Sequence, residues 1–312
     1  MPQVTVIIPN YNHGPYLQAR IESVIQQTFQ DIELIIIDDC SADNSREVID
    51  KYAQHPLVRA VILNTENSGS PFSQWNKALQ LAAADWIWVA ESDDLAEPDF
   101  LEKLYPKAIQ QKQISLVYCD SIILSAQEEQ SDRKYSTIKN LRYGVNKWSH
   151  PYEQDGKAEL NEYLKKDCTI NNVSAVLFRK SYALDVLKNL EGFRFHGDWM
   201  FYISMAEKGR VVYLPEALNH YREHAANHSK AASGGAFNKP ECFRILSYLL
   251  QQAYISDKQQ LIRHFTKAYL GFGLWKEKPF SADGLYRQYQ QFNRRLATKV
   301  LWQLIKSKII PG

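Results

Sequence analysis

The segment VTVIIPNYNHGPYLQARIESVIQQTFQDIELIII, residues 4–37, shows the pattern that decides the fold. Residues 4–9 are apolar and rich in β-branched side chains, and residues 17–29 repeat apolar positions at a spacing near 3.6, which predicts a strand followed by a helix. The same alternation continues with strands at 33–37, 57–64 and 86–90 and helices at 45–52 and 75–84. Because such apolar strands alternate with helices, we expect an α/β, doubly wound and mainly parallel sheet covered on both faces.

The second part of the chain is less regular. It predicts a helix from Pro98 to about residue 111, strands at 114–124, 174–180 and 210–215, and helices at 182–190 and 197–209. The polar stretch 126–156 has no clear period, and we expect a loop over the site there. Residues from about 240 onward read as a small helical appendage. We therefore expect a main domain over 1–229, with halves 1–112 and 113–229, and a basic helical region over 230–312.

Composition excludes several classes of protein. The 312 residues are 45% hydrophobic and 23% charged, which is ordinary for a globular chain and not for a disordered or multi-span membrane protein. The four cysteines show no CxxC spacing, so neither a zinc knuckle nor a disulfide framework is expected. The first residues do not resemble a signal peptide and no apolar window is long enough to span a membrane, so we expect a cytoplasmic location.

The loops after the first strands carry the polar residues. In a sheet of this kind ligands bind where the strands end, so the loops that begin at Pro9, Asp38, Asn64 and Glu91 should line one crevice. The first of these loops, residues 9–14, contains neither GxGxxG nor GxxxxGK[ST], so no dinucleotide fingerprint or P-loop is present to hold phosphates.

The run Glu91-Ser92-Asp93-Asp94 is the sharpest chemical feature of the sequence. Crowded carboxylates at a strand end favour a hard cation, Mg²⁺ or Mn²⁺, held by one or two acids together with a substrate diphosphate. The alternative is a turn that caps the following helix. The pair Asp38-Asp39 has a similar alternative, since the loop after it could simply cap the helix at 45–52.

Seven motifs occur in one order and together resemble family 2 glycosyltransferases. They are VTVIIPNYN, TFQDIELIIIDDCSADNS, NSGSPFSQWNKAL, ADWIWVAESDD, NNVSAVLFRKS, HGDWMFYISMAEKG and LNHYREHAANHS. The resemblance covers about residues 3–229 and implies the GT-A fold and an inverting enzyme that uses a nucleotide sugar. The basic C-terminal region is not part of it.

The resemblance also implies roles for single residues. Tyr11 and Asp39 match the residues that contact the nucleotide base, and Pro9 and Asn12 shape that loop. Asp93 matches the second acid of the family's DXD motif, Glu91 stands where many members have Asp, and Asp94 is a substitute metal ligand. The remaining residues implied to contact the nucleotide sugar are Asn67, Gly69, Asn76, Ser92 and Arg222.

Catalysis is implied for Asp198, which matches the family's base position. It would take the proton from an acceptor hydroxyl as the oxygen attacks the anomeric carbon. The alternative is a residue that caps the helix over 197–209. The segment 220–224 resembles the YRxH motif, in which Arg222 would bind phosphate and His224 would donate a bond or ligate the metal. Its histidines could instead lie on a surface loop.

The net charge of +2 hides an asymmetry, because residues 230–312 carry fourteen Lys and Arg against four Asp and Glu. The last helical stretch, FNRRLATKVLWQLIKSKII, is basic on one side and apolar on the other, which is typical of a helix lying at a membrane surface. We therefore predict peripheral contact of 285–312 with the inner face of a membrane.

The sequence thus predicts a metal-dependent glycosyltransferase that moves a sugar from a nucleoside diphosphate sugar to a glycan or lipid-linked glycan, in surface polysaccharide biosynthesis. Three alternatives stay open. A non-catalytic nucleotide-sugar-binding module is compatible with Glu91 and a lone Asp198. A nucleotidyltransferase would require a Gly- and Lys-rich first loop, which NYNHG is not, and a nucleic-acid binder would use only the basic tail. We expect no nucleic-acid partner.

Overall fold

The computed structural model describes residues 1–124, 130–170, 172–223, 238–270 and 285–309. The chain forms two compact units. The first contains Met1–Glu159 and Thr169–Ala225, and the second contains Leu160–Cys168 and Ala226–Gly312. The sequence pattern does not indicate that Leu160–Cys168 belongs to the helical part. The functional boundaries expected at residues 112 and 229 remain predictions.

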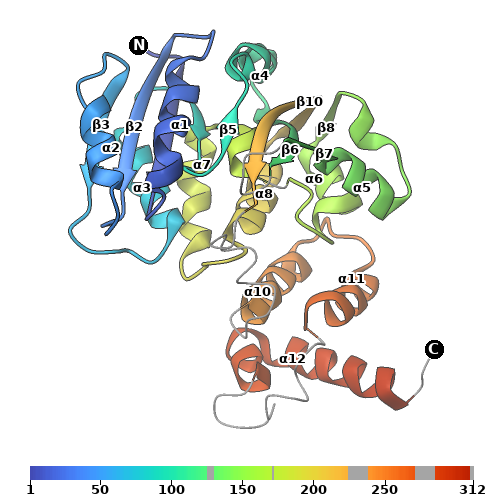
Figure 1. Ribbon diagram of the computed structural model, residues 1–312. Coiled ribbons are helices and arrows are strands. Elements are labelled where there is room, and N and C mark those ends of the chain that lie inside the picture. The colour runs from blue at the N-terminus through green and yellow to red at the C-terminus, as the bar shows by residue number, and fades with distance from the viewer. Residues whose placement is uncertain (125–129, 171, 224–237, 271–284, 310–312) are drawn as a thin grey trace. The chain divides into compact units, whose positions relative to one another are not determined.

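A ten-stranded mixed sheet forms the centre of the first unit (Figure 1). The strand order is β3-β2-β1-β4-β9-β6-β10-β5, with β7 added to β6 and β8 added to β10. Strands β1 (Val4–Asn10), β2 (Ile32–Asp38), β3 (Val58–Leu63) and β4 (Trp86–Val89) are parallel, as the sequence predicts. The other strands are β5 (Leu95–Ala96), β6 (Ile114–Leu124), β7 (Gln130–Lys134), β8 (Tyr152–Asp155), β9 (Val176–Arg179) and β10 (Arg210–Arg222).

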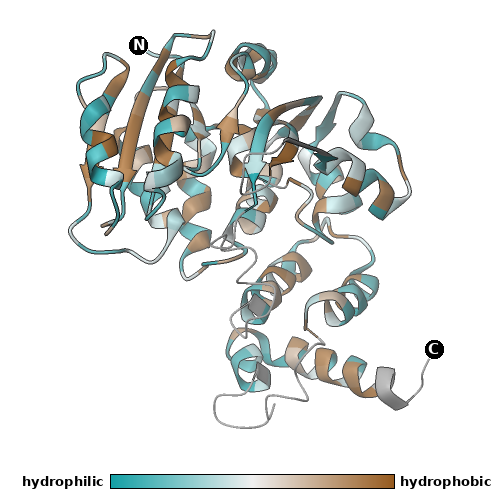
Figure 2. Cartoon of the chain, in the orientation of Figure 1, coloured by the Kyte–Doolittle hydropathy of each residue, from teal (hydrophilic) through white to brown (hydrophobic). Residues whose placement is uncertain are grey.

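The parallel strands form because their residues are apolar on both faces. Every residue of β1, β2 and β4 is buried, which is the pattern of a sheet covered by helices on both sides. In Figure 2 strand β2 is brown along its length, whereas helices α1 and α2 carry both brown and teal. Glu33, near the start of β2, is neutralised locally, since it accepts from Thr5 Oγ1 at 2.5 Å and pairs with Arg59 at 3.3 Å.

Helices follow the strands as expected. The connections in the first half are α1 (Gly14–Ile25), α2 (Ser45–Tyr52), α3 (Pro71–Leu81) and α4 (Phe100–Ile109). Later come a 3₁₀ turn at Val173–Ala175, α7 (Lys180–Val186) with a 3₁₀ turn at Leu187–Leu190, and α8 (Gly197–Lys208). Helix α3 begins at Pro71, four residues before the expected start, because Pro fits the first turn of a helix.

The stretch 126–156 is more ordered than the sequence indicated. It contains β7, helix α5 (Tyr135–Tyr143), a 3₁₀ turn at Lys147–Ser149 and β8; residues 125–129 lie outside the described part of the chain. Helix α6 (Gly156–Glu159) follows. Strand β10 continues to Arg222 instead of ending near residue 215, because β6 offers a parallel partner along nearly its whole length. The expectation of a loop over 126–156 was therefore wrong for the described residues.

The second unit is helical. It contains a π-helical turn at Leu160–Leu164, α10 (Asn238–Gln251), α11 (Lys258–Phe265), a π-helical turn at Thr266–Leu270 and α12 (Leu285–Ile309). The apolar side chains of α10 and α12 form its core, where the rings of Phe243 and Tyr289 stack at 4.4 Å. Asn293 interrupts α12, and its Oδ1 accepts from Leu296 N at 3.0 Å, which restarts the helix. Across the described residues, we find no helix with the length and apolar character that a membrane span requires.

Candidate functional site

The polar loops meet where the parallel strands end. Asn10 is the register partner of Asp38, and β4 lies on the other side of β1, so the loops after these three strands share one edge of the sheet. His13 Nδ1 lies 2.8 Å from Ser92 Oγ and joins the first loop directly to residues 91–94, which we call the acidic loop. The loops expected from the sequence to lie together do so, and Ser92 between them is 1% exposed.

Asn12 fixes the shape of the first loop. Its φ of 55° lies in the left-handed region, which Asn adopts more readily than most residues. Its backbone nitrogen donates to Ser41 Oγ at 2.9 Å, and its Oδ1 accepts from Ala42 N at 2.8 Å. The neighbouring Tyr11, which follows Pro9 and Asn10, is 43% exposed. The loop thus holds an aromatic ring at the surface, in a position to stack on a planar ligand.

Asp39 is buried and closely held by the third loop. It accepts from Asn64 Nδ2 at 2.9 Å, from Ser68 N at 3.0 Å and from Ser68 Oγ at 2.8 Å. Gln74 Nε2 in turn donates to Ser68 Oγ at 2.8 Å. A base that donated an N–H to Asp39 would have to share this carboxylate with Ser68 or displace it.

Asp94 ties the acidic loop to two other segments of the chain by hydrogen bonds. It is 2% exposed, its Oδ1 accepts from Arg222 N at 3.0 Å and its Oδ2 accepts from Asn172 Nδ2 at 2.8 Å. Burial and the charge of Asp93 raise the pKa of Asp94 to about 6. Because both of its oxygens are engaged, Asp94 is better placed to hold the loop than to coordinate a cation, and Asp93 is the more accessible acid.

Glu91 lies on the inner side of the loop. Burial and the charges of Asp93 and Asp94 raise the pKa of Glu91 to about 8, against opposing interactions with the Trp75 indole and Arg20. Its backbone is fixed as well, because Glu91 N donates to Ser174 Oγ at 3.1 Å and Glu91 O accepts from Arg20 Nε at 2.8 Å. These bonds fix the backbone of Glu91, whose side chain is partly buried, as that of Asp93 is. Coordination of a cation by Glu91 stays a prediction.

Arg222, the last residue of β10, contacts the acidic loop. Its side chain is fully buried, its Nε donates to Asp93 O at 2.8 Å and its guanidinium lies over the Tyr16 ring at 4.8 Å. These contacts make Arg222 a support of the acidic loop. The forked bond to phosphate expected from the sequence stays a prediction.

Asp198 lies in the first turn of α8, where its Oδ1 accepts from Trp199 N at 2.7 Å. The start of α8 packs directly on α3, because a Cβ at Gly197 would lie 2.2 Å from the Phe72 ring. Phe72 also contacts Trp75 edge-on at 5.0 Å, and Trp75 contacts Phe201 at 5.7 Å. This aromatic packing brings the α8 start, the third loop and Glu91 into one neighbourhood.

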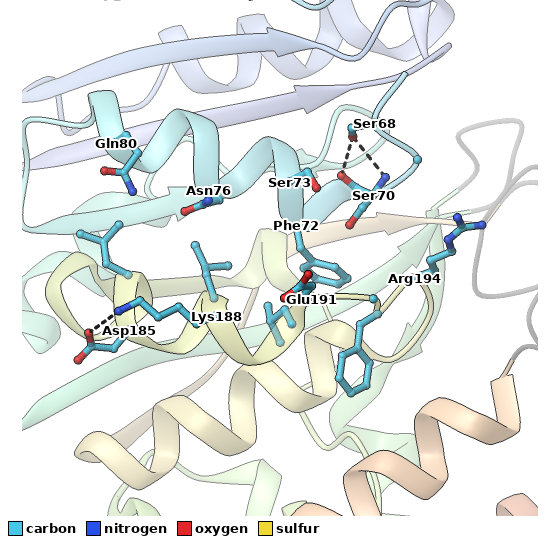
Figure 3. Close-up of a pocket in the computed structure, with 16 residues that line it drawn as sticks. Ser68, Ser70, Phe72, Ser73, Asn76, Gln80, Asp185, Lys188, Glu191 and Arg194 are labelled. Carbon is cyan, nitrogen blue, oxygen red and sulfur yellow. Dashed lines mark hydrogen bonds and ion pairs between the residues drawn. The ribbon is translucent and has the colours of Figure 1, made fainter. Parts of the chain in front are cut away.

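A cavity of about 800 Å³ opens beside the third loop. Figure 3 shows Asn76 and Gln80 of α3 on one wall, Asp185 and Lys188 of α7 and the turn after it on the other, and Arg194 at one end. Gly69, whose φ of 67° requires glycine, lines the same cavity. Asn67 caps this turn, since its Oδ1 accepts from Gly69 N at 2.6 Å.

The donor set of the acidic loop fits Mg²⁺ or Mn²⁺ bound together with a ligand. Carboxylate oxygens are hard donors, and Mg²⁺ is usually held by one or two of them plus substrate phosphates. Among the described residues no three His, Cys, Asp or Glu side chains are arranged to hold an ion by themselves. Asp93 is therefore the protein ligand that we expect, and His224 lies outside the described residues.

Two supports of this site were not anticipated from the sequence. Arg20 falls on the apolar face of α1 with Leu17, Ile21 and Val24, and a lone charge in such a stripe is the signal that could have found it. Asn64 links Asp39 to Gln74, but nothing distinguished it from an ordinary loop residue.

The sheet order, the parallel strand ends and the acidic loop together define a protein of the GT-A class. The model of the family described as "Glycosyl transferase family 2" matches residues 5–185, which is more than half of the chain. The chain therefore belongs to glycosyl transferase family 2.

One curated relative is the chondroitin synthase of Pasteurella multocida (strain Pm70), which is 37% identical over 119 residues. That alignment covers 38% of this chain and 12% of the relative. The chain likewise spans only 37% and 40% of the lengths of two further relatives.

Solved structures support the fold. The S. aureus protein TarS 1-349 in complex with UDP-GlcNAc has a TM-score of 0.68 and 15% identity, and covers 97% of this chain and 88% of its own. The mannosyltransferase PcManGT of Pyrobaculum calidifontis, in complex with GDP-Man and Mn²⁺, has a TM-score of 0.56 and 14% identity, over 98% and 86% of the two chains. At this identity the likeness carries the fold alone.

Proposed function

We propose that this chain transfers a sugar from a nucleoside diphosphate sugar to a hydroxyl group of a glycan or lipid-linked glycan, with inversion at the anomeric carbon. The observation that carries the proposal is the convergence of an exposed Tyr11, a buried Asp39 and the acidic loop at one edge of the sheet. The family membership supports the same reaction class.

In this proposal Asp198 is the general base. It accepts the proton of the acceptor hydroxyl while that oxygen forms a bond to the anomeric carbon. The bond from that carbon to the diphosphate breaks on the opposite side, and its electron pair leaves with the nucleoside diphosphate.

The leaving group develops negative charge, which the acidic loop cannot neutralise by itself. Bound Mn²⁺ or Mg²⁺ would supply that neutralisation, and Asp93 would hold it. Arg222 and Asp94 keep the Asp93 backbone in place through the bonds described above. The complex of PcManGT with GDP-Man and Mn²⁺ is consistent with this choice of cation.

The acceptor is proposed to be a surface polysaccharide or its lipid-linked precursor. Membership of the family and the name of the matched chondroitin synthase, a polymer-forming enzyme, support a polysaccharide acceptor. Phe72 lines the cavity beside Asn76 and Gly69, and its ring also packs against Gly197, the residue before the proposed base.

A thermal-shift panel of UDP, GDP, dTDP and CMP, each with Mn²⁺, with Mg²⁺ and with EDTA, tests the proposed donor class. One nucleoside diphosphate is expected to stabilise the chain in the presence of a metal. At a hundredfold excess over Kd, binding contributes about 2.7 kcal/mol, which raises the Tm of a domain of this size by roughly 5–10 °C. No shift with any nucleotide under any condition would refute nucleotide-sugar use.

We further propose that α12 contacts an anionic membrane surface from the cytoplasmic side. Its solvent-exposed face is basic and carries two aromatic rings, with Phe292 48% and Trp302 58% exposed. Among the α12 residues whose exposure the structure describes, the exposed cationic ones are Arg287, Arg294, Arg295 and Lys299. Each basic residue near an anionic surface contributes about 1 kcal/mol, and a buried indole adds apolar area.

Sedimentation with vesicles tests this contact on the full chain. We expect binding to vesicles rich in phosphatidylglycerol, little binding to phosphatidylcholine alone, and release at high salt. Trp302→Ser should weaken binding several-fold, whereas Leu141→Ser, which changes an 84% exposed side chain of the first unit, should not. Equal binding to both vesicle types, or an equal loss in both variants, would contradict the assignment to α12.

A further inference from the structure

Arg20 is a buried cation at the back of the acidic loop. Its side chain is 0% exposed, and its guanidinium lies 5.7 Å from the centre of the Trp88 ring. Its Nε donates to Glu91 O at 2.8 Å. Its two terminal nitrogens donate no hydrogen bond within the described part of the chain. A buried guanidinium with two such nitrogens is costly unless opposite charges lie near it.

The opposite charges are those of the loop. Asp94, Asp93 and Glu91 attract the Arg20 charge, in that order, while burial lowers the pKa of Arg20 to about 10, still far above neutrality. Arg222 is the second cation of the cluster. At neutral pH the raised pKa of about 8 keeps Glu91 mostly protonated, so two carboxylates, Asp93 and Asp94, face two guanidinium groups. Above that pH Glu91 adds a third negative charge, and loss of either guanidinium would then leave two uncompensated negative charges in a largely buried loop.

We propose that Arg20 is a positioning residue that holds the acidic loop in its binding geometry by compensating the charge of its carboxylates. Arg20, on α1, donates its Nε to Glu91 O, and Arg222, on β10, donates its Nε to Asp93 O. The two bonds hold the loop at two points. The action of Arg20 on substrate is indirect, through the placement of Asp93. This role rests on the proposed function only in taking the loop to be the metal and diphosphate site.

A double-mutant cycle separates charge from packing. Arg20→Met keeps most of the side-chain volume and removes the positive charge. Glu91→Gln removes one carboxylate. The double variant therefore has the same net charge in this cluster as the natural chain. Arg179→Met is the matched control. Arg179 also lies over a β4 tryptophan, Trp86 at 4.7 Å, and also donates its Nε to a backbone carbonyl, Ile114 O at 3.1 Å.

The first readout is Tm without ligand at pH 9, where Glu91 is ionised and Glu91→Gln removes a charge. Arg20→Met is expected to lower Tm by roughly 10 °C, as removal of one partner of a buried ion pair does, and Glu91→Gln should restore about half of that loss. Glu91→Gln should restore nothing in Arg179→Met. If Glu91→Gln changes Tm equally in the natural and Arg20→Met backgrounds, Arg20 acts by packing and the proposal fails, whatever the chain binds.

The second readout is affinity at the same pH, with Mg²⁺, for UDP or GDP, whichever stabilises the natural chain. Its Kd should rise about tenfold in Arg20→Met, recover in the double variant and stay unchanged in Arg179→Met. If Arg20→Met does not fold, Arg20→Lys decides the matter, because lysine keeps the charge but loses the Nε bond. A folded Arg20→Lys with near-natural Kd supports charge compensation, and an unfolded one overturns it.

Discussion

Asp198→Asn is expected to abolish sugar transfer while leaving the fold and donor binding intact. General-base catalysis contributes about 10²–10⁴ to the rate, so kcat should fall by roughly 10³. The fold should survive because the oxygen of a side-chain amide can still accept from Trp199 N, as Asp198 Oδ1 does at 2.7 Å. The measurement is release of nucleoside diphosphate from the donor identified by the thermal-shift panel, with and without a glycan acceptor.

Glu207→Gln provides the matched control, since it neutralises a carboxylate at the other end of the same helix. Its kcat and Tm should equal those of the natural chain. If Asp198→Asn retains full turnover, another group must accept the proton. If the natural chain itself binds the nucleotide sugar but shows no turnover with any acceptor, the non-catalytic binding module becomes the better description.

Asp93→Ala is expected to remove metal-dependent nucleotide binding. Asp93, which is more accessible than Asp94, is the proposed ligand of Mn²⁺ or Mg²⁺. Its loss should weaken binding of the nucleoside diphosphate about 100-fold or more, since even outer-shell partners cost about 10–100-fold. The affinity of Asp93→Ala with metal should then equal that of the natural chain in EDTA. Isothermal titration with the stabilising nucleotide, in metal and in EDTA, measures both.

Asp94→Asn is expected to lower stability, whereas Asp93→Ala is expected to lower metal-dependent binding. Comparing the two variants therefore separates the two roles. An amide at position 94 cannot accept from both Arg222 N and Asn172 Nδ2 as the carboxylate does. One buried donor is then left without a partner, at a cost of about 1–3 kcal/mol. We expect Asp94→Asn to lower Tm without ligand and Asp93→Ala to leave it nearly unchanged. If instead Asp93→Ala lowers Tm and Asp94→Asn does not, Asp94 is the better candidate for the metal ligand and Asp93 for the residue that holds the loop.

Sequence predicted the first half of the fold well for a physical reason. Strands such as β1 and β2 are buried on both faces, so their residues are apolar without interruption and the signal is local. The order of the loops along the chain then placed Tyr11, Asp39 and the acidic loop at one edge.

The parts that sequence missed depend on distant partners. Strand β5 has only two residues and exists because β10 passes beside it, and β7 exists because β6 extends far enough to pair with it. The separate roles of Asp93 and Asp94 were equally hidden. They follow from Asn172 and Arg222, which lie more than seventy residues away and reach Asp94 only in the folded chain.

The contact between Gly197 and Phe72 has a consequence for redesign of this enzyme. The Phe72 ring packs edge-on against Trp75, so a larger residue at position 197 would have to displace this ring or push the start of α8, and Asp198 with it, out of place. Positions 72 and 197 therefore form one coupled unit. A library that aims to change donor or acceptor preference should vary them jointly, because single changes at position 197 would be eliminated as inactive before any new specificity could be seen.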